Sequence, residues 1–115
     1  MGKVGQTFIR QFPADRPYGE IRAFCHKRTI EETDRVDVFR GDIKIQADVQ
    51  AAIDGVTHVA HLATCKETPD DVTDVTVKGL FRVLEECRES ASFQQFILIG
   101  GDASMGHLFI HIPFR

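Results

Sequence analysis

The chain has 115 residues, of which 43% are hydrophobic and 27% charged, a composition that fits one ordinary globular domain. Its formal net charge of −3 gives no electrostatic reason to expect binding to nucleic acid or to an anionic membrane surface. It has no run of about 18 apolar residues that could span a membrane and no apolar signal peptide at its start, so we expect a cytoplasmic protein.

The first part of the chain predicts a helix followed by two short strands. Apolar residues at helical spacing predict the helix over residues 3–12. Residues 21–24 and 36–39 are short apolar segments that predict strands, and the second of them leads into Gly41 and Asp42. The polar segment 29–35 between the strands is expected to form a loop or a helical turn.

A second helix and a third strand follow in the middle of the chain. Val49 and Ile53 lie on one face of a short helix predicted over residues 46–53. Gly55 comes shortly after it, where the end of a helix favours a residue with positive φ. Residues 57–63 are largely apolar and predict a buried strand.

A long helix is predicted to begin at Thr68. Thr68 suits the N-cap, and Pro69 suits the first helical position. The carboxylates of Asp70 and Asp71 lie in the first turn, where the positive end of the helix dipole stabilises negative charge. The apolar face of this helix is expected to consist of Val72, Val75, Leu80, Val83, Leu84 and Cys87.

Two further apolar segments complete the sequence. Residues 95–99 are almost continuously apolar, which predicts a strand of a parallel sheet buried on both faces. Residues 107–114 alternate in polarity and predict another strand, with Pro113 near its end. Because strands and helices alternate along the chain, we expect an α/β fold with a parallel sheet.

The cysteines and histidines give no metal-binding pattern. The three cysteines lack a CxxC spacing and are expected to be reduced thiols of a cytosolic protein. His58 and His61 are three residues apart in a predicted strand, so they point to opposite faces. His107 and His111 have no acidic or thiol neighbour in the sequence, and we expect no metal site.

Four short motifs follow one another at characteristic spacing. They are GKVG at residues 2–5, GDI at 41–43, VAHLA at 59–63, and KG at 78–79 with VLEEC at 83–87. In this order they resemble the N-terminal half of an extended short-chain dehydrogenase/reductase of the NAD-dependent epimerase/dehydratase type. The resemblance implies a Rossmann-like, doubly wound parallel sheet over residues 1–106, with residues 107–115 as an apolar, strand-like tail.

The same resemblance implies a site for NAD or NADP. The positions that would lie near the cofactor are Gly2, Gly5, Arg28, Asp42, Ile43, Leu62 and Ala63. Gly2 would let the backbone approach the pyrophosphate at the start of the first helix, and Gly5 would let that helix pack closely on the sheet. Asp42 and Ile43 would flank the adenine, and Leu62 and Ala63, at the end of the third strand, would line the middle of the cofactor. Purely structural roles remain open for three of these residues. Asp42 is a common type of turn residue, and Leu62 and Ala63 can be core residues of the strand.

The choice between NAD and NADP depends on the end of the second family strand. NAD enzymes of the family favour an acid there, whereas this chain has Cys25-His26-Lys27-Arg28. Basic side chains suit a 2′-phosphate, so the resemblance favours NADP. The alternative is that Lys27 and Arg28 are only solvated loop charges.

The sequence departs from the family pattern at several places. The usual first strand, which would be central in the sheet, does not precede Gly2, so we expect a sheet lacking it and a portion truncated at both ends. The family serine aligns with Gly101, the nearest hydroxyl is that of Ser104, and no Tyr-x-x-x-Lys occurs. The single tyrosine is Tyr18, and Thr76 stands where the family often has asparagine. We therefore expect a catalytically incomplete chain and assign no catalytic residue.

Two functions remain open at this point. The first is the cofactor-binding portion of an oxidoreductase acting on a secondary alcohol or ketone, with nucleotide sugars as one substrate class. The second is a non-catalytic remnant with a binding or dimerisation role. In the second case the apolar tail at residues 107–112 would supply a strand to an exposed sheet edge, and a homodimer is one outcome.

Overall fold

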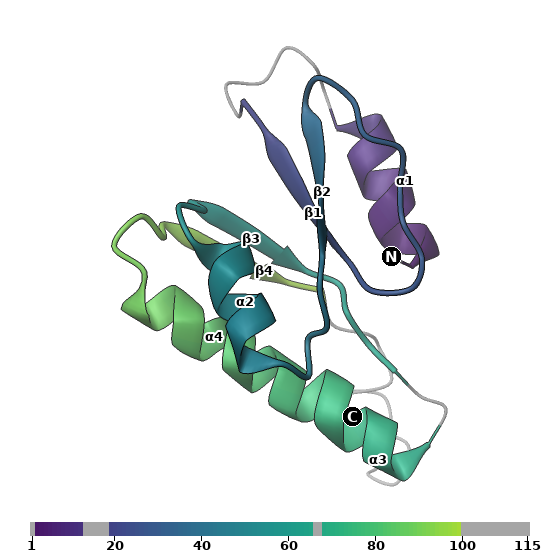
Figure 1. Cartoon of the computed structure of the whole chain (residues 1–115), viewed down its shortest axis with the longest axis vertical. Coiled ribbons are helices and arrows are strands. Elements are labelled where there is room, and N and C mark those ends of the chain that lie inside the picture. Colours follow the sequence, from purple (N-terminus) through teal and green to yellow (C-terminus); the bar gives the residue numbers. More distant parts are fainter. Residues whose placement is uncertain (1, 13–18, 66–67, 100–115) are drawn as a thin grey trace, which may run out of the picture.

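Short parallel strands alternate with helices in the computed structural model, which describes residues 2–12, 19–65 and 68–99 (Figure 1). In chain order the elements are α1 (Lys3–Gln11), β1 (Ile21–Cys25), β2 (Val36–Arg40), α2 (Gln46–Ile53), β3 (His58–His61), α3 (Pro69–Asp71), the π-helix η1 (Val72–Val77), α4 (Lys78–Glu89) and β4 (Gln95–Leu98). Each strand predicted before residue 100 is present, within three residues of its expected bounds.

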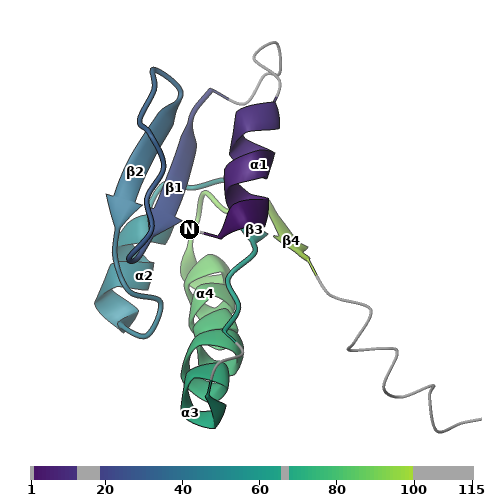
Figure 2. The same cartoon turned by 90° about the vertical axis from the view of Figure 1, so that its right-hand side faces the viewer.

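The strands pair in two separate parallel sheets (Figure 2). β1 runs parallel to β2, with Ile21 beside Val36. β3 runs parallel to β4, with His58 beside Gln95. Within the described ranges no strand joins β1 to β3, so helices and side chains, not one hydrogen-bond ladder, hold the two sheets together.

Strand β1 is covered on both faces because successive side chains of a strand point in opposite directions. Ala23 and Cys25 are 2% and 0% exposed, and they form one cluster with Val36 that Ile9 of α1 covers. Phe24 instead packs against a second cluster, which α2 and α4 build. The buried members of this α2–α4 cluster are Ile43, Val49, Ile53, Val83 and Cys87. Helices thus lie on both faces of parallel strands, as a doubly wound α/β fold requires.

The C-terminal end of α2 is fixed by a glycine and by an arginine from a neighbouring strand. Gly55 has φ 73°, as the sequence predicts for a residue after a helix. Arg22 of β1 donates from Nη1 to the carbonyl oxygens of Ala52 and Asp54, at 2.8 Å each. The guanidinium therefore satisfies carbonyl groups that the end of a helix leaves without intrahelical partners.

The predicted long helix is divided into three parts. It begins as expected, since the Thr68 hydroxyl accepts a hydrogen bond from the Asp71 backbone N–H at 3.1 Å. A π-helix then interrupts the α-helix at Val72–Val77, which the sequence did not predict. The predicted apolar face is also partly wrong, because Leu84 is 42% exposed. The buried stripe of α4 follows Gly79, Val83 and Cys87, and Leu84 lies about 100° around the axis from Val83.

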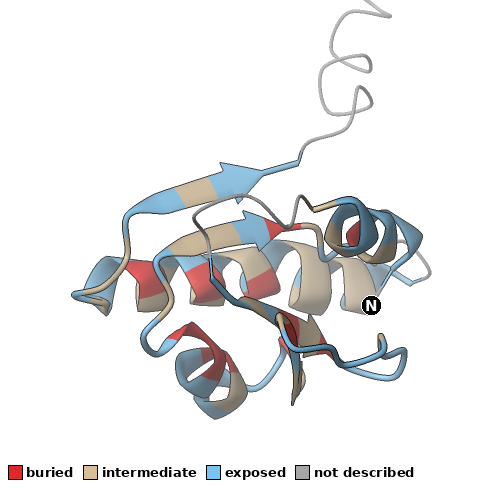
Figure 3. Cartoon of the chain, turned by 90° about the horizontal axis from the view of Figure 1, so that it is seen from above, coloured by how far each residue is buried: buried red, intermediate tan, exposed pale blue. Residues whose placement is uncertain are grey.

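The predicted burial of β3 and β4 is only partly confirmed. β3 is shorter than expected, and Ala60 within it is exposed. In and after β4, Ile97, Leu98 and Ile99 are 41%, 54% and 57% exposed, and Figure 3 shows this strand mostly in the exposed colour. Val59 and Phe96 pack against the α2–α4 cluster, so the described helices cover this sheet on one face. An apolar run in the sequence indicates that both faces of a strand can be buried. It does not show which helix or strand would cover the second face.

Several sequence predictions lie outside the described residues. They concern the strand-like tail at 107–115 with His107 and His111, the serine position at Gly101 and the nearby Ser104, and Tyr18.

Candidate functional site

The residues expected to contact a cofactor lie where the strands end and α1 begins. Because β1 and β2 are parallel, with Cys25 beside Arg40, the loops that follow these two strands leave the sheet side by side. Figure 2 shows the N-terminus of α1 near the C-terminal ends of β1 and β3. In parallel α/β folds, ligands bind outside this edge of the sheet.

The N-terminus of α1 is suited to an anion. Gly2 is the N-cap, no side chain caps the helix, and no acidic residue lies in its first turn. A Cβ added at Gly2 would meet no atom within 4 Å, so the space in front of the helix is open. Uncapped N–H groups and the helix dipole both favour a negatively charged group at such a place. Gly5 is buried within α1, in keeping with close packing of this helix on the sheet.

The loops after β1 and β2 are joined by a contact between His26 and Asp42. The Nε2 atom of His26 lies 3.5 Å from Oδ2 of Asp42. The other carboxylate oxygen of Asp42 accepts a hydrogen bond from the Lys44 backbone N–H at 2.9 Å, as in a turn. The backbone N–H of Asp42 donates to Asp48 Oδ2 at 2.9 Å. The structure therefore brings together the two segments expected to contact the adenosine part of a cofactor, while Arg28 is exposed in the loop beyond His26.

Ile43 is turned towards the core. It is 9% exposed and belongs to the α2–α4 cluster. It also lies close to α4, since a Cβ added at Gly79 would lie 3.1 Å from both Cδ1 and Cγ1 of Ile43. The place expected for Ile43 beside an adenine stays a prediction.

The loop after β3 is tied to η1. Leu62 is half-buried and Ala63 is exposed, and neither is part of β3. Two residues further on, the Cys65 backbone N–H donates to Thr76 Oγ1 at 2.9 Å, and the Thr76 hydroxyl donates to the Cys65 carbonyl oxygen at 3.0 Å. Sequence reasoning marked Thr76 only as a departure from the family asparagine and did not predict this contact.

His61 is the last residue of β3 and is 7% exposed. Its ring stacks on Phe96 of β4, with centroids 6.0 Å apart and an interplanar angle of 26°. Burial lowers the pKa of the His61 imidazole below its ordinary value of 6.5. At neutral pH this residue is therefore an uncharged part of the sheet beside the loop that carries Leu62.

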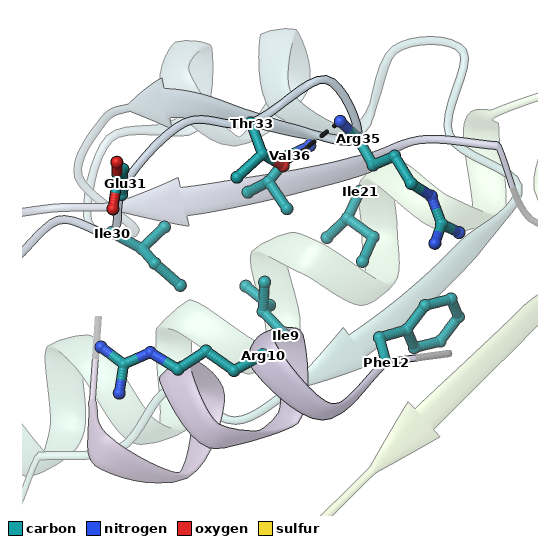
Figure 4. A pocket seen from close by; sticks show the side chains of 9 residues that line it. All are labelled: Ile9, Arg10, Phe12, Ile21, Ile30, Glu31, Thr33, Arg35 and Val36. Atoms are coloured by element: carbon teal, nitrogen blue, oxygen red, sulfur yellow. Dashed lines mark hydrogen bonds between the residues drawn. The ribbon is translucent and has the colours of Figure 1, made fainter. Parts of the chain in front are cut away.

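A cavity of about 290 Å³ lies at the opposite edge of the molecule (Figure 4). It opens between the C-terminal half of α1 and the first residues of β1 and β2, and its apolar lining includes Ile9, Phe12, Ile21 and Val36. Because it lies at the N-terminal ends of the strands, it is separate from the candidate cofactor site.

Two further features are absent from residues 2–12, 19–65 and 68–99. No group of three or more histidine, cysteine or acidic side chains could hold a metal ion there. No helix in the same ranges is both long and apolar enough to cross a membrane. No disulfide joins Cys25, Cys65 and Cys87.

Comparisons with known proteins agree with the geometry. A protein-family model described as the 3-beta hydroxysteroid dehydrogenase/isomerase family matches residues 1–101. Two crystal structures of uronate dehydrogenase from Agrobacterium tumefaciens, one of them a mutant complexed with NAD, each superpose with a TM-score of 0.74 at 13% identity. The superposition covers 88% of this chain and 38% of the uronate dehydrogenase chain. No curated protein gives a significant match. At this identity the likeness shows a shared fold, and the predicted Rossmann-like α/β fold is confirmed.

Proposed function

This chain belongs to the 3-beta hydroxysteroid dehydrogenase/isomerase family, and from that membership we propose that it is the dinucleotide-binding portion of an NAD(P)-dependent oxidoreductase. The proposed cofactor-binding domain comprises residues 1–106. In a whole enzyme of this type the bound cofactor exchanges a hydride with a secondary alcohol or ketone, and nucleotide sugars are one proposed substrate class. This chain spans 38% of the uronate dehydrogenase that it superposes on, so a whole enzyme of that kind has further parts.

The observation that carries the proposal is the uncapped N-terminus of α1 at the C-terminal ends of the strands. A dinucleotide has a negatively charged pyrophosphate, which Gly2 and the first N–H groups of α1 would hold. Asp42 follows β2 at the same edge, where it would accept hydrogen bonds from the adenosine part. Leu62 and Ala63, after β3, would line the middle of the cofactor.

We propose a preference for NADP over NAD, on the basis of the charges after β1. His26, Lys27 and Arg28 are consecutive, exposed and basic, which suits a 2′-phosphate. Asp42 offsets part of this charge because it lies 3.5 Å from His26. The opposite preference has its own support, because one of the uronate dehydrogenase structures contains NAD.

Thermal unfolding in the presence of NADP, NAD and ADP tests the proposal. A ligand that binds only the folded chain stabilises it by about 2.7 kcal/mol at 100 times its dissociation constant. We expect the melting temperature to rise with NADP at lower concentration than with NAD. If neither dinucleotide raises it at saturation, the chain is not a cofactor-binding domain.

The second candidate, a non-catalytic protein that associates with itself, is favoured by one observation. Ile97 and Leu98 point to opposite faces of β4 and are both exposed, and Ile99 directly after the strand is exposed as well. Exposed apolar side chains at such a site favour association. Sedimentation velocity separates the two candidates: a dimer without any response to dinucleotides supports the second, and a monomer stabilised by NADP supports the first.

We also propose that this chain alone does not catalyse hydride transfer, since no Tyr-x-x-x-Lys occurs in the sequence. Reduction of NADP by the purified chain in the presence of uronates or nucleotide sugars would contradict this.

A further inference from the structure

The π-helical turn η1 contacts the loop after β3 directly and is linked through Arg82 of α4 to the loop after β2. These two loops carry most of the candidate cofactor residues. The hydrogen-bond pattern of a π-helix is present at the end of η1, where the Lys78 backbone N–H donates to the carbonyl oxygen of Thr73, five residues earlier. Turns of this kind are rare and often occur at functional sites. Here the turn continues directly into α4, a helix anchored in the core by Val83 and Cys87.

The first contact is made by Thr76 to the loop after β3. Its hydroxyl group accepts from the Cys65 backbone N–H at 2.9 Å and donates to the Cys65 carbonyl oxygen at 3.0 Å. Thr73, one turn earlier, behaves differently, because its hydroxyl donates to the carbonyl of Pro69 within the same helical segment at 3.0 Å. The two threonines of η1 therefore have different roles: Thr73 bonds within its own helical segment, and Thr76 bonds a separate loop.

The second contact is made to the loop after β2. Arg82, one turn beyond η1, is half-buried and donates from Nη1 to the Asp74 carbonyl at 3.3 Å and to the Ile43 carbonyl at 3.5 Å. Gly79 lies close to the Ile43 side chain, with no room for a Cβ at an ordinary distance. The guanidinium thus connects a carbonyl of η1 with the backbone of the loop that contains Asp42 and Ile43.

We propose that η1 fixes both candidate cofactor loops, residues 41–45 and 62–65, and that Thr76 and Arg82 are positioning residues for cofactor binding. Neither segment is part of a helix or strand. The loop after β2 has a backbone hydrogen bond of its own, from the Ile45 N–H to the Asp42 carbonyl at 2.9 Å, and Arg82 adds a contact to the Ile43 carbonyl. A loop that is already ordered loses less conformational entropy when a ligand binds, and the affinity is correspondingly higher. The part of the proposal that concerns affinity rests on the proposed function.

The test compares Thr76→Val, which keeps the shape and removes the hydroxyl, with Thr76→Ser, which keeps the hydroxyl. Thr73→Val is the matched control, because it removes a hydroxyl from the same turn without touching either loop. Two quantities are measured on the full chain: the dissociation constant of NADP by titration calorimetry, and the exchange rate of the Cys65 amide hydrogen by NMR without cofactor.

We expect T76V to weaken NADP binding about 3- to 10-fold, the equivalent of about one net hydrogen bond. We expect the Cys65 amide to exchange about tenfold faster in the same variant. T76S should restore both quantities to within about twofold of the wild type, and T73V should change neither. Arg82→Met should instead speed exchange at Ile43 and Lys44 and weaken NADP to a similar extent.

Three results would overturn the proposal. They are an unchanged Cys65 exchange rate in T76V, an unchanged NADP affinity despite faster exchange, and an equal loss of affinity in T73V. If the wild type binds neither NADP nor NAD, the proposed function fails on its own. The exchange rates of T76V and T73V then decide whether η1 holds the loop, with faster exchange in T76V alone supporting it and equal rates rejecting it.

Discussion

The close approach of α4 to the loop after β2 depends on Gly79, and the variant Gly79→Ala tests it. A Cβ at this position would lie 3.1 Å from two atoms of the Ile43 side chain. Ile43 is 9% exposed and packs within the α2–α4 cluster, so it has little room to move aside. Overpacking of this kind costs about 1–3 kcal/mol. Alanine is favoured over glycine inside a helix by about 1 kcal/mol, which acts in the opposite direction.

We expect G79A to lower the free energy of unfolding by about 1 kcal/mol, the difference between these two effects. Urea unfolding followed by circular dichroism measures this change. The background variant Ile43→Val removes Cδ1 and with it one of the two contacts at 3.1 Å, so the cost of G79A should fall by about half there. A stabilising effect of G79A in the wild type, or an equal cost in both backgrounds, would refute the packing argument.

Three further predictions concern the cofactor site, the buried histidine and the exposed strand. Gly2→Asp should raise the melting temperature slightly by capping α1, and should weaken NADP about tenfold because its carboxylate repels the pyrophosphate; an unchanged affinity by calorimetry would place the anion elsewhere. Burial lowers the pKa of His61, so the unfolded chain binds more protons there, and this stabilising contribution is complete above about pH 6.5 and is lost as the pH falls. Between about pH 7.5 and about pH 5.5 the wild type should therefore lose up to about 1 kcal/mol more stability than His61→Phe in urea unfolding, and parallel losses would contradict this. Leu98→Lys should reduce any self-association in sedimentation velocity and change stability by less than about 0.5 kcal/mol, since Leu98 is 54% exposed; an unchanged dimer would exclude the face of β4 that carries Leu98 as the contact.

Local signals in the sequence located most of the elements. Thr68 and Pro69 predicted the start of α3, and Gly55 predicted the end of α2, because such signals act through residues close by in the chain. The short motifs indicated the family, and the family model confirms that assignment over residues 1–101.

The features that the sequence did not predict depend on contacts between distant segments. Thr76 of η1 forms its hydrogen bonds with Cys65, eleven residues earlier in the chain. The helical spacing of apolar residues within one segment contains no information about such contacts. The contact of His26 with Asp42 could have been predicted from the parallel register of β1 and β2, which places the residues after both strands side by side.

The separation of the two sheets has a consequence for the cooperativity of unfolding. Phe24 of β1 and Val59 of β3 both pack against the α2–α4 cluster, so this cluster transmits stability from one sheet to the other. The pair β1–β2 has its own second cluster with α1, whereas the sheet β3–β4 has apolar residues exposed beyond the helices that cover it. Native-state hydrogen exchange should therefore resolve two units, with the amides of β3 and β4 opening at lower free energy than those of β1 and β2. The helical layer couples two short ladders that open separately, and a ligand that binds across the ends of β1 and β3 would strengthen that coupling.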